Sequence, residues 1–309
     1  FSIWAIFCLI CRLAASLTAS SSTSGTEELF EILKAKGIGA YVGKVNMDRN
    51  APDFIIETTE ESLRGTRYLI EKYKTEQLVK PIITPRFAPT SSEQLLRGLG
   101  ALAVEYNLPV QSHLSENREE VKWVKNLFRD AKSYSDVYLK HNLLGRTETL
   151  MAHAIYLTEE EELLAKETHL TLVHCPDSNI NVRSGIMPVR RYLDMGLRIG
   201  LGSDIGGGHK IAMNEAMVRA IQVSKLLSLK DEAQQPLSVS EAFYLGTKGG
   251  GHFFGKTGSF EKGFWFDALV IEDDTMIAER YSLEDRLEKF IYTGDDRNIL
   301  ARYVEGEKI

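Results

Sequence analysis

Three side chains of the kinds that bind metal ions stand where short β-like runs of the sequence end. They are His113, His153 and Asp204. If these runs are parallel strands of a barrel, their carboxyl ends lie at one face and the three side chains converge there. Imidazole and carboxylate groups suit Zn²⁺ or Fe²⁺, with a coordination position left open for water. A single histidine at a strand end is more often a hydrogen-bonded rim residue, but the same placement in three units favours a metal site.

Two further features next to such runs could act on a substrate. Glu116 lies three residues after His113, where a carboxylate can take a proton from water and deliver it to a leaving nitrogen. The alternative is that Glu116 lies in the first turn of the next helix, where the helix dipole favours a carboxylate. Arg86 and Phe87 directly follow another run and offer a planar cation beside an aromatic ring, a pair that suits a planar heterocycle with carbonyl acceptors.

The remaining histidines and cysteines carry weaker signals. Residues 174–179 follow a further run and could line the same pocket with polar groups. Cys175 has no base in its local sequence, so we expect a packed thiol and not a nucleophile. Three more histidines are expected to be surface or structural residues: His141, His169 and His252.

Strand-like and helix-like segments alternate along most of the chain. The strand segments are Ile38–Val45, Val79–Thr84, Pro109–His113, Thr149–His153, Leu170–His174 and Arg198–Ser203, with a weaker one at Leu13–Ser20. The helix segments between and after them are Thr26–Lys36, Thr58–Lys74, Ser92–Asn107, Thr158–Glu167, Pro188–Met195 and Ile211–Leu229. This alternation predicts a parallel sheet with α/β architecture.

An eight-stranded (β/α) barrel with its first strand missing is the predicted fold. The alternative, an open doubly wound sheet, usually carries a Gly-rich loop after its first strand, and no such motif is present. After about Lys230 the rhythm changes to a helix at Ser238–Gly246 and strands at Phe266–Ile271 and Tyr303–Ile309. We therefore expect an unassigned stretch at 1–24, the barrel at 25–246, and a C-terminal segment at 247–309 that belongs to a small β domain.

The composition is that of a globular protein. Hydrophobic residues make up 43% and charged residues 26% of the 309 residues, and the net charge of −6 argues against nucleic acid as a partner. The three cysteines cannot form a disulfide framework, which favours the cytoplasm, and Cys8 and Cys11 are more simply apolar residues than a metal half-site. The apolar run at 1–10 is about half the length that a membrane span needs, so no membrane association is expected. Because the chain begins with Phe1, we expect that it starts within a longer protein.

Several segments together resemble the guanine deaminases, a family within the amidohydrolase superfamily, and most closely the bacterial forms. The segments are GKVNMD at 43–48, TPRF at 84–87, QSHLSEN at 111–117, MAH at 151–153, HCPDSN at 174–179 and GLGSD at 200–204. The resemblance runs from about Thr26 to the C-terminus. It implies a TIM barrel of the amidohydrolase type flanked by a small β-sandwich, of which this chain carries the C-terminal part.

The resemblance also implies a function and a site. The expected reaction is hydrolysis of guanine to xanthine and ammonia at one zinc ion, with iron as the alternative metal. His113 and Asp204 are then zinc ligands and also contact the substrate. His153 acts beside the metal, and Asp204 helps to deprotonate the attacking water. Glu116 is the proton shuttle, and Arg86 with Phe87 holds the purine. A homodimer is implied as well.

The chain departs from the family pattern at one place. The family takes two further zinc ligands from a His-x-His at the end of the first strand, and no histidine precedes His113 here. We therefore expect this chain alone to bind zinc weakly and to turn over little guanine. Two other functions remain open: a deaminase of another heterocycle, such as an adenosine-type or triazine substrate, and a non-catalytic pseudoenzyme that binds purines.

Overall fold

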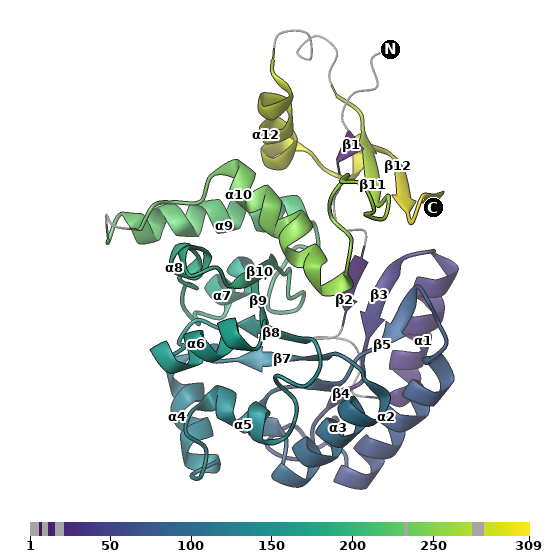
Figure 1. Cartoon of the computed structure of the whole chain (residues 1–309), viewed down its shortest axis with the longest axis vertical. Coiled ribbons are helices and arrows are strands. Elements are labelled where there is room, and N and C mark those ends of the chain that lie inside the picture. The colour runs from purple at the N-terminus through teal and green to yellow at the C-terminus, as the bar shows by residue number, and fades with distance from the viewer. Residues whose placement is uncertain (1–5, 8–11, 16–21, 232–233, 274–280) are drawn as a thin grey trace.

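The main body is a barrel of parallel strands surrounded by helices (Figure 1). The computed structural model describes residues 6–7, 12–15, 22–231, 234–273 and 281–309. The first group of parallel strands has the order β2 (Arg12–Ala15), β3 (Gly39–Val42) and β5 (Val79–Pro81). The short strands β4 (Val45–Asn46) and β6 (Thr84–Pro85) pair beyond them. The second group is β7 (Val110–Leu114), β8 (Thr149–His153), β9 (Thr171–His174) and β10 (Arg198–Leu201).

A parallel bridge between Ile83 and Val110 connects the two groups of strands. The strands therefore follow one another around the barrel in chain order, which confirms the predicted fold. Strands β2 and β10 lie at the two ends of this series, and no ladder joins them within the described residues. The weak strand predicted at Leu13–Ser20 corresponds to β2, although residues 16–20 lie outside the described part of the chain.

Helices follow most of the strands. They are α1 (Thr23–Ala35), α2 (Thr59–Tyr73), α3 (Glu93–Tyr106), α4 (Arg118–Leu127), α5 (Tyr134–Lys140), α6 (Glu159–Glu167), α7 (Pro176–Asn181), α8 (Val189–Asp194), α9 (Met213–Ser228) and α10 (Val239–Tyr244). The start of α2 shows why the sequence predicts these boundaries. Thr58 accepts a hydrogen bond from the backbone N–H of Glu61, whose side chain in turn accepts from the backbone N–H of Thr58. Helices α4, α5 and α7 had not been predicted.

Two of the predicted strands are interrupted in the middle. The segment at Ile38–Val45 forms β3 and β4 with a break at Gly43, and Val79–Thr84 divides into β5 and β6. A Cβ atom at position 43 would collide with the carbonyl oxygen of Ile82 and with Thr84 Oγ1. The side-chain amide of Asn46 donates to the carbonyl oxygens of Lys44 at 2.8 Å and Thr84 at 3.1 Å. The bond to Thr84 joins the two segments, and the bond to Lys44 stabilises the break within the first of them.

Alternate residues of the strands face two different apolar cores. Met151, Leu172 and Ile199 belong to the large cluster between the strands and the surrounding helices. Leu150 and Val173 belong to a smaller cluster inside the barrel that also contains Phe253. The parity of a residue along its strand therefore decides whether it points into the barrel or toward the helices.

A small antiparallel sheet lies apart from the barrel, together with helix α12 (Figure 1). Its strand order is β1 (Ile6–Phe7), β11 (Ala268–Ile271), β12 (Ile299–Val304) and β13 (Glu307–Lys308). Helix α12 (Leu283–Thr293) packs Leu287 and Phe290 against the buried side of β11. The predicted strand at Phe266–Ile271 contains β11, whereas β1, α12 and the start of β12 had not been predicted.

The short helices η1 (Ala88–Thr90), η2 (Leu245–Gly249), η3 (His252–Phe254) and η4 (Asp296–Asn298) complete the described elements. Cys8 and Cys11 lie outside the described residues. None of the described helices is both long enough and apolar enough to cross a membrane.

Candidate active site

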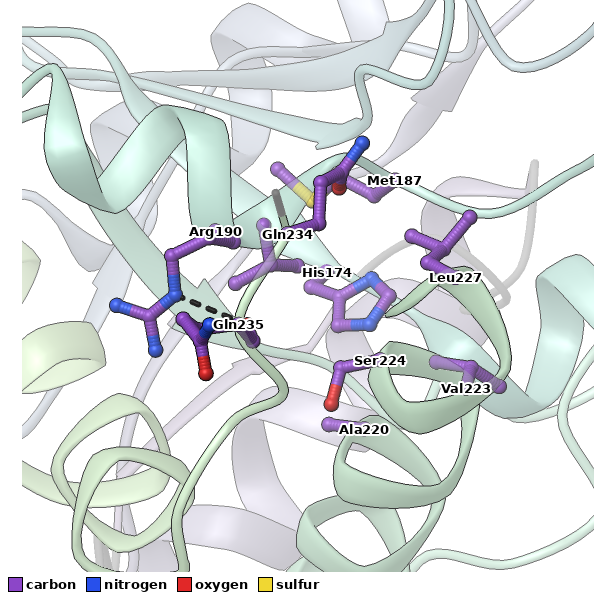
Figure 2. Close-up of a pocket in the computed structure, with 10 residues that line it drawn as sticks. His174, Met187, Arg190, Ala220, Val223, Ser224, Leu227, Gln234 and Gln235 are labelled. Carbon is purple, nitrogen blue, oxygen red and sulfur yellow. Dashed lines mark hydrogen bonds between the residues drawn. The ribbon is translucent and has the colours of Figure 1, made fainter. Parts of the chain in front are cut away.

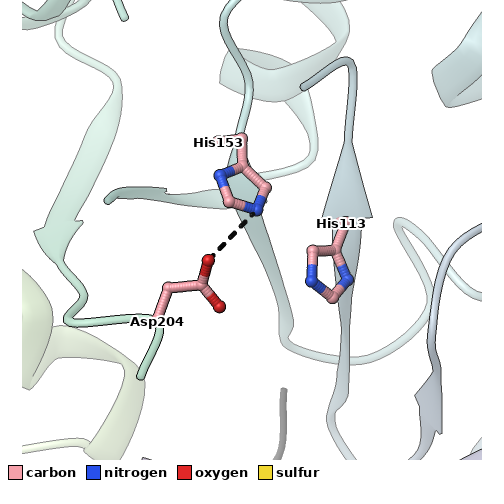
Figure 3. A group of neighbouring side chains, drawn as sticks. All are labelled: His113, His153 and Asp204. Carbon is pink, nitrogen blue, oxygen red and sulfur yellow. Dashed lines mark ion pairs between the residues drawn. The ribbon is translucent and has the colours of Figure 1, made fainter. Parts of the chain in front are cut away.

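Three potential metal ligands meet at the carboxyl-end face of the barrel. His113 lies in β7, His153 ends β8, and Asp204 follows β10. One ligand atom of each lies within 4.8 Å of those of the other two. The imidazole rings of His113 and His153 are 5.2 Å apart between centroids, and His153 Nε2 lies 3.9 Å from Asp204 Oδ2. Figure 3 shows the two rings and the carboxylate around one common space.

Hydrogen bonds on the far side of each ring set which nitrogen carries the proton. His113 Nδ1 lies 2.5 Å from the backbone carbonyl oxygen of Arg86, and His153 Nδ1 lies 2.8 Å from Asn179 Oδ1. Both oxygens accept, so each Nδ1 carries a hydrogen and each Nε2 has a free lone pair. His153 Nε2 is buried and has no hydrogen-bond partner among the described residues. A buried lone pair of this kind suits a metal ion or a bound polar molecule.

Glu116 faces the same space. Its Oε2 lies 3.8 Å from His153 Nε2, and its Oε1 accepts a hydrogen bond from Ser184 Oγ at 2.6 Å. The Ser184 hydroxyl fixes one oxygen and leaves the other directed at the histidine. Helix α4 begins at Arg118 with Asn117 as its N-cap, so Glu116 lies before the helix and not in its first turn. The helix-dipole interpretation of Glu116 is therefore wrong.

Arg86 and Phe87 border the site beside His113. The Arg86 guanidinium lies over the Phe87 ring at 5.2 Å, and its Nη1 contacts Met47 Sδ at 3.7 Å. No carboxylate among the described residues forms an ion pair with it. The Phe87 ring meets His113 edge-on, with 6.2 Å between ring centroids, and Trp123 at 6.3 Å. An uncompensated planar cation and an aromatic ring thus lie next to a potential metal ligand.

A buried tyrosine connects these two parts of the site from behind. The Tyr138 hydroxyl of α5 accepts from the backbone N–H of Ala88 at 3.0 Å and donates to the carbonyl oxygen of His113 at 2.8 Å. It also lies 2.9 Å from Ser112 Oγ. The side chain is fully buried. Helix α5 therefore links the loop of Arg86 to strand β7.

The backbone is strained where the site residues leave their strands. Four non-glycine residues there have left-handed φ values: Ser115 at 48°, His153 at 72°, Ala154 at 44° and Asp204 at 44°. Such a conformation costs about 1–3 kcal/mol for a non-glycine residue, and aspartate tolerates it better than alanine. The turns bring the side chains of His153 and Asp204 to the mouth of the barrel.

Burial determines the protonation of several groups around the site. Burial and the neighbouring His153 ring lower the pKa of His113, so its imidazole is neutral and able to bind a metal. Burial raises the pKa of Glu120 to about 7, although Tyr134 donates a hydrogen bond to its carboxylate at 2.6 Å. Glu120 lies one turn into α4, behind the site.

The structure corrects one expectation about residues 174–179. Asn179 does reach the site, where it bonds His153, but His174 shares its strand face with Leu172 and points toward the helices. Cys175 is a free, buried thiol whose pKa is raised by burial, in agreement with the expected packed residue. His141, whose Nδ1 lies 2.7 Å from the carbonyl oxygen of Val137, ends α5. His169 and His252 are exposed.

Sequence reasoning missed Ser184 and Tyr138, which support the site without being in it. Ser184 lies 68 positions from Glu116, and no local pattern connects the two. Tyr138 lies on the unpredicted helix α5, whose spacing relative to His113 gives no signal either. Both side chains are recognisable only from the three-dimensional contacts.

Comparisons with known proteins agree with this architecture. The model of the amidohydrolase family matches residues 13–309. The guanine deaminase of Dictyostelium discoideum is 38% identical over 94% of this chain and 67% of its own length, and that of Mus musculus is 41% identical over 91% and 65%. A crystal structure of guanine deaminase from C. acetobutylicum with guanine bound in its active site superposes with a TM-score of 0.91. It is 52% identical over 94% of this chain and 70% of its own. The chain thus spans about two thirds of the length of these relatives.

Proposed function

Because the chain belongs to the amidohydrolase family and, within it, to the guanine deaminases, we propose that it hydrolyses guanine to xanthine and ammonia. Water adds to the amino-bearing carbon of the purine, the carbon–nitrogen bond breaks, and the nitrogen leaves as ammonia. One observation carries the proposal in this chain. His113, His153 and Asp204 surround a common space, and the carboxylate of Glu116 borders it.

The donor set fits a divalent metal ion. His113 and Asp204 would hold it. His153 Nε2, which is buried and has no hydrogen-bond partner among the residues described, lies within reach. Two neutral imidazoles and a carboxylate are ligands that zinc and iron both accept. When bound, the ion would act as a Lewis acid toward the attacking water. Hydrogen bonds from the two Nδ1 atoms keep both Nε2 atoms available for this role.

Proton transfer in this proposal depends on Glu116. Its free oxygen faces His153, and the Ser184 hydroxyl restricts the rotation of the carboxylate. Glu116 takes one proton from the attacking water and delivers it to a ring nitrogen of the purine, and it then takes the proton of the newly added hydroxyl group and delivers it to the departing amine. Asp204 also contacts the attacking water and assists its deprotonation.

The substrate is held by groups on the side of the site near β6. The Arg86 guanidinium donates hydrogen bonds to the carbonyl and ring nitrogen acceptors of guanine, and Phe87 packs beside the ring. Support for this assignment is that Arg86 forms no ion pair with a described residue and that Phe87 lies edge-on to His113. A neutral substrate also agrees with the net charge of −6.

Zinc content and ammonia release test the proposal together. The purified chain is analysed for zinc and iron per chain and is assayed with guanine, adenosine and a triazine as separate substrates. A second preparation carries the coding sequence upstream of Phe1, because this chain spans about two thirds of the length of its relatives. Size-exclusion chromatography with light scattering on both preparations reports whether the expected homodimer forms.

About one metal ion per chain and ammonia release from guanine would support the proposal. If only the extended preparation has both, this chain needs further ligands, as expected from the absence of a histidine before His113. Faster ammonia release from adenosine or from the triazine than from guanine would show that guanine is not the substrate. Absence of metal and turnover in both preparations would refute the proposal and favour a purine-binding pseudoenzyme.

A further inference from the structure

A second polar site lies outside the barrel, on the opposite face of β9 from the active site. It is a small cavity between β9, α8 and α9, with about 10 Å³ available to the centre of a water molecule. Its walls include His174, Met187, Ser224, Leu227 and Gln234 (Figure 2). The space is about that of one water molecule.

The imidazole ring of His174 faces this cavity. His174 is only 1% exposed, and neither Nδ1 nor Nε2 has a hydrogen-bond partner among the described residues. Gln234 also lines the cavity, and its buried Oε1 has no hydrogen-bond partner in the part of the chain that the structure describes. A polar atom that is buried without a hydrogen bond destabilises the folded state. A single molecule in this small cavity can bond one ring nitrogen of His174 and Gln234 Oε1 and so supply bonds that the described residues do not.

The neighbouring polar groups direct their hydrogen bonds elsewhere. Ser224 Oγ donates to the carbonyl oxygen of Ile221 at 2.8 Å and accepts from the backbone N–H of Leu237 at 2.9 Å. The amide nitrogen of Gln234 donates to Asp231 at 3.2 Å. The wall around His174 is otherwise mainly apolar.

The same contacts define the chemistry of the occupant. Burial lowers the pKa of His174 to about 3, so its ring is neutral and presents one N–H donor and one nitrogen acceptor. Gln234 Oε1 only accepts. The one charged group in the wall, Arg190, is paired with Glu241 at 2.7 Å and also donates to the carbonyl oxygen of Gln235. A charged occupant would therefore lose its hydration without gaining a free counter-charge.

We propose that this cavity binds a neutral molecule of about the size of water that both donates and accepts hydrogen bonds, held by His174 and Gln234. Water has this chemistry. Ammonia shares it, and the assignment of ammonia, but not of the site, rests on the proposed function, which releases it. The occupant bridges His174 and Gln234 and so connects β9 to the segment that follows α9.

The number of slowly exchanging internal waters tests the site without any need for catalysis. It is obtained from ¹⁷O relaxation dispersion on the full chain, and a high-resolution crystal structure provides the position. We expect H174F to lose at least one such water relative to the wild-type chain, and H252F, a matched change at an exposed histidine, to lose none. If H174F does not fold, Q234M serves instead, because it removes the acceptor at the other side of the cavity.

Ammonia is distinguished from water by NMR of chains with ¹⁵N-labelled histidine. Ammonium chloride or sodium chloride is added at alkaline pH, where much of the ammonia is neutral. A shift of the His174 ring signals with ammonium chloride alone assigns the site to ammonia, and its absence while the slow water persists assigns it to water. Equal water counts in the wild-type and variant chains, an empty cavity in the electron density and no shift would overturn the proposal. A failure of guanine turnover would leave this test unaffected.

Discussion

The hydroxyl of Tyr138 should contribute more to stability than that of any comparable buried tyrosine with a single hydrogen bond. The change Y138F removes one oxygen atom and leaves the ring in place. It breaks contacts with the backbone N–H of Ala88, the carbonyl oxygen of His113 and the hydroxyl of Ser112. All three partners lie behind the candidate active site.

The expected size follows from the number of bonds lost. The single proton of the Ser112 hydroxyl can go to the carbonyl oxygen of Pro85, 2.8 Å away. Y138F therefore loses two hydrogen bonds, those with Ala88 and His113. A buried hydrogen bond contributes about 1 kcal/mol net, so Y138F should lower the free energy of unfolding by about 2 kcal/mol.

Tyr192 provides the matched control, because it is equally buried and its hydroxyl makes one hydrogen bond, to the carbonyl oxygen of Ala154 at 2.9 Å. Y192F should therefore lower the free energy of unfolding by about 1 kcal/mol.

Equilibrium unfolding in urea measures both values. Circular dichroism and tryptophan fluorescence are followed on the same samples, since coincident transitions justify a two-state treatment. We expect Y138F to be more destabilising than Y192F by about 1 kcal/mol with an unchanged m-value. Equal losses in the two variants would show that the hydrogen bonds of Tyr138 do not hold the loop of Ala88 to β7, and the argument for α5 as a support of the site would fail.

Four other changes test the site and its surroundings. E116Q should reduce the turnover of guanine by about 10²–10⁴-fold with unchanged metal content, whereas the exposed E119Q should not; normal turnover in E116Q would exclude the proton-shuttle role. R86K should raise KM for guanine by about 10–100-fold with a smaller effect on kcat, as measured by steady-state kinetics, because a lysine loses the planar set of donors; an unchanged KM would argue against substrate contact. N179L removes the acceptor that fixes the tautomer of His153, so it should lower guanine turnover by about 10–100-fold. Unchanged ammonia release by N179L would mean that His153 needs no fixed tautomer. Because burial raises the pKa of Glu120 to about 7, its protonated form favours the folded state, and its stabilising contribution is lost as the pH rises from about 4 to 7. Urea unfolding across that range should show a loss of up to about 3 kcal/mol that E120Q lacks, and identical pH profiles would contradict the assignment.

The positions of the chemical groups were predictable because they depend on a repeated unit. His113 and His153 lie on strands, and Asp204 follows one, in stretches with clear apolar character, so the rule that carboxyl ends of parallel strands share a face was sufficient. The direction of the His174 side chain was also predictable, because successive side chains of a strand point to opposite faces. Leu172 and His174 share one face of β9, and Leu172 belongs to the core beneath the helices.

The supporting elements differ in how much signal they leave in the sequence. Helix α4 has an apolar face of Val121, Val124 and Leu127 that packs into the large core, so this helix was predictable from the spacing of its apolar residues but was not predicted. Helix α5 has seven residues, too few to establish a period. The breaks in the strands near Gly43 depend on close contact with Ile82, a residue far along the chain. Such features arise from tertiary contacts and leave no local signal.

The left-handed turns at Ser115, His153 and Ala154 imply a conflict between durability and activity. Glycine adopts such a backbone without steric strain, so selection for heat resistance acting alone would favour glycine at these positions. At His153 that exchange would remove the side chain that the turn presents at the mouth of the barrel. At Ser115 and Ala154 it would leave the side chains of His113 and His153 in place but loosen the backbone that aims them. Relief of this strain would therefore raise the thermal stability of the chain, but only with a loss of activity.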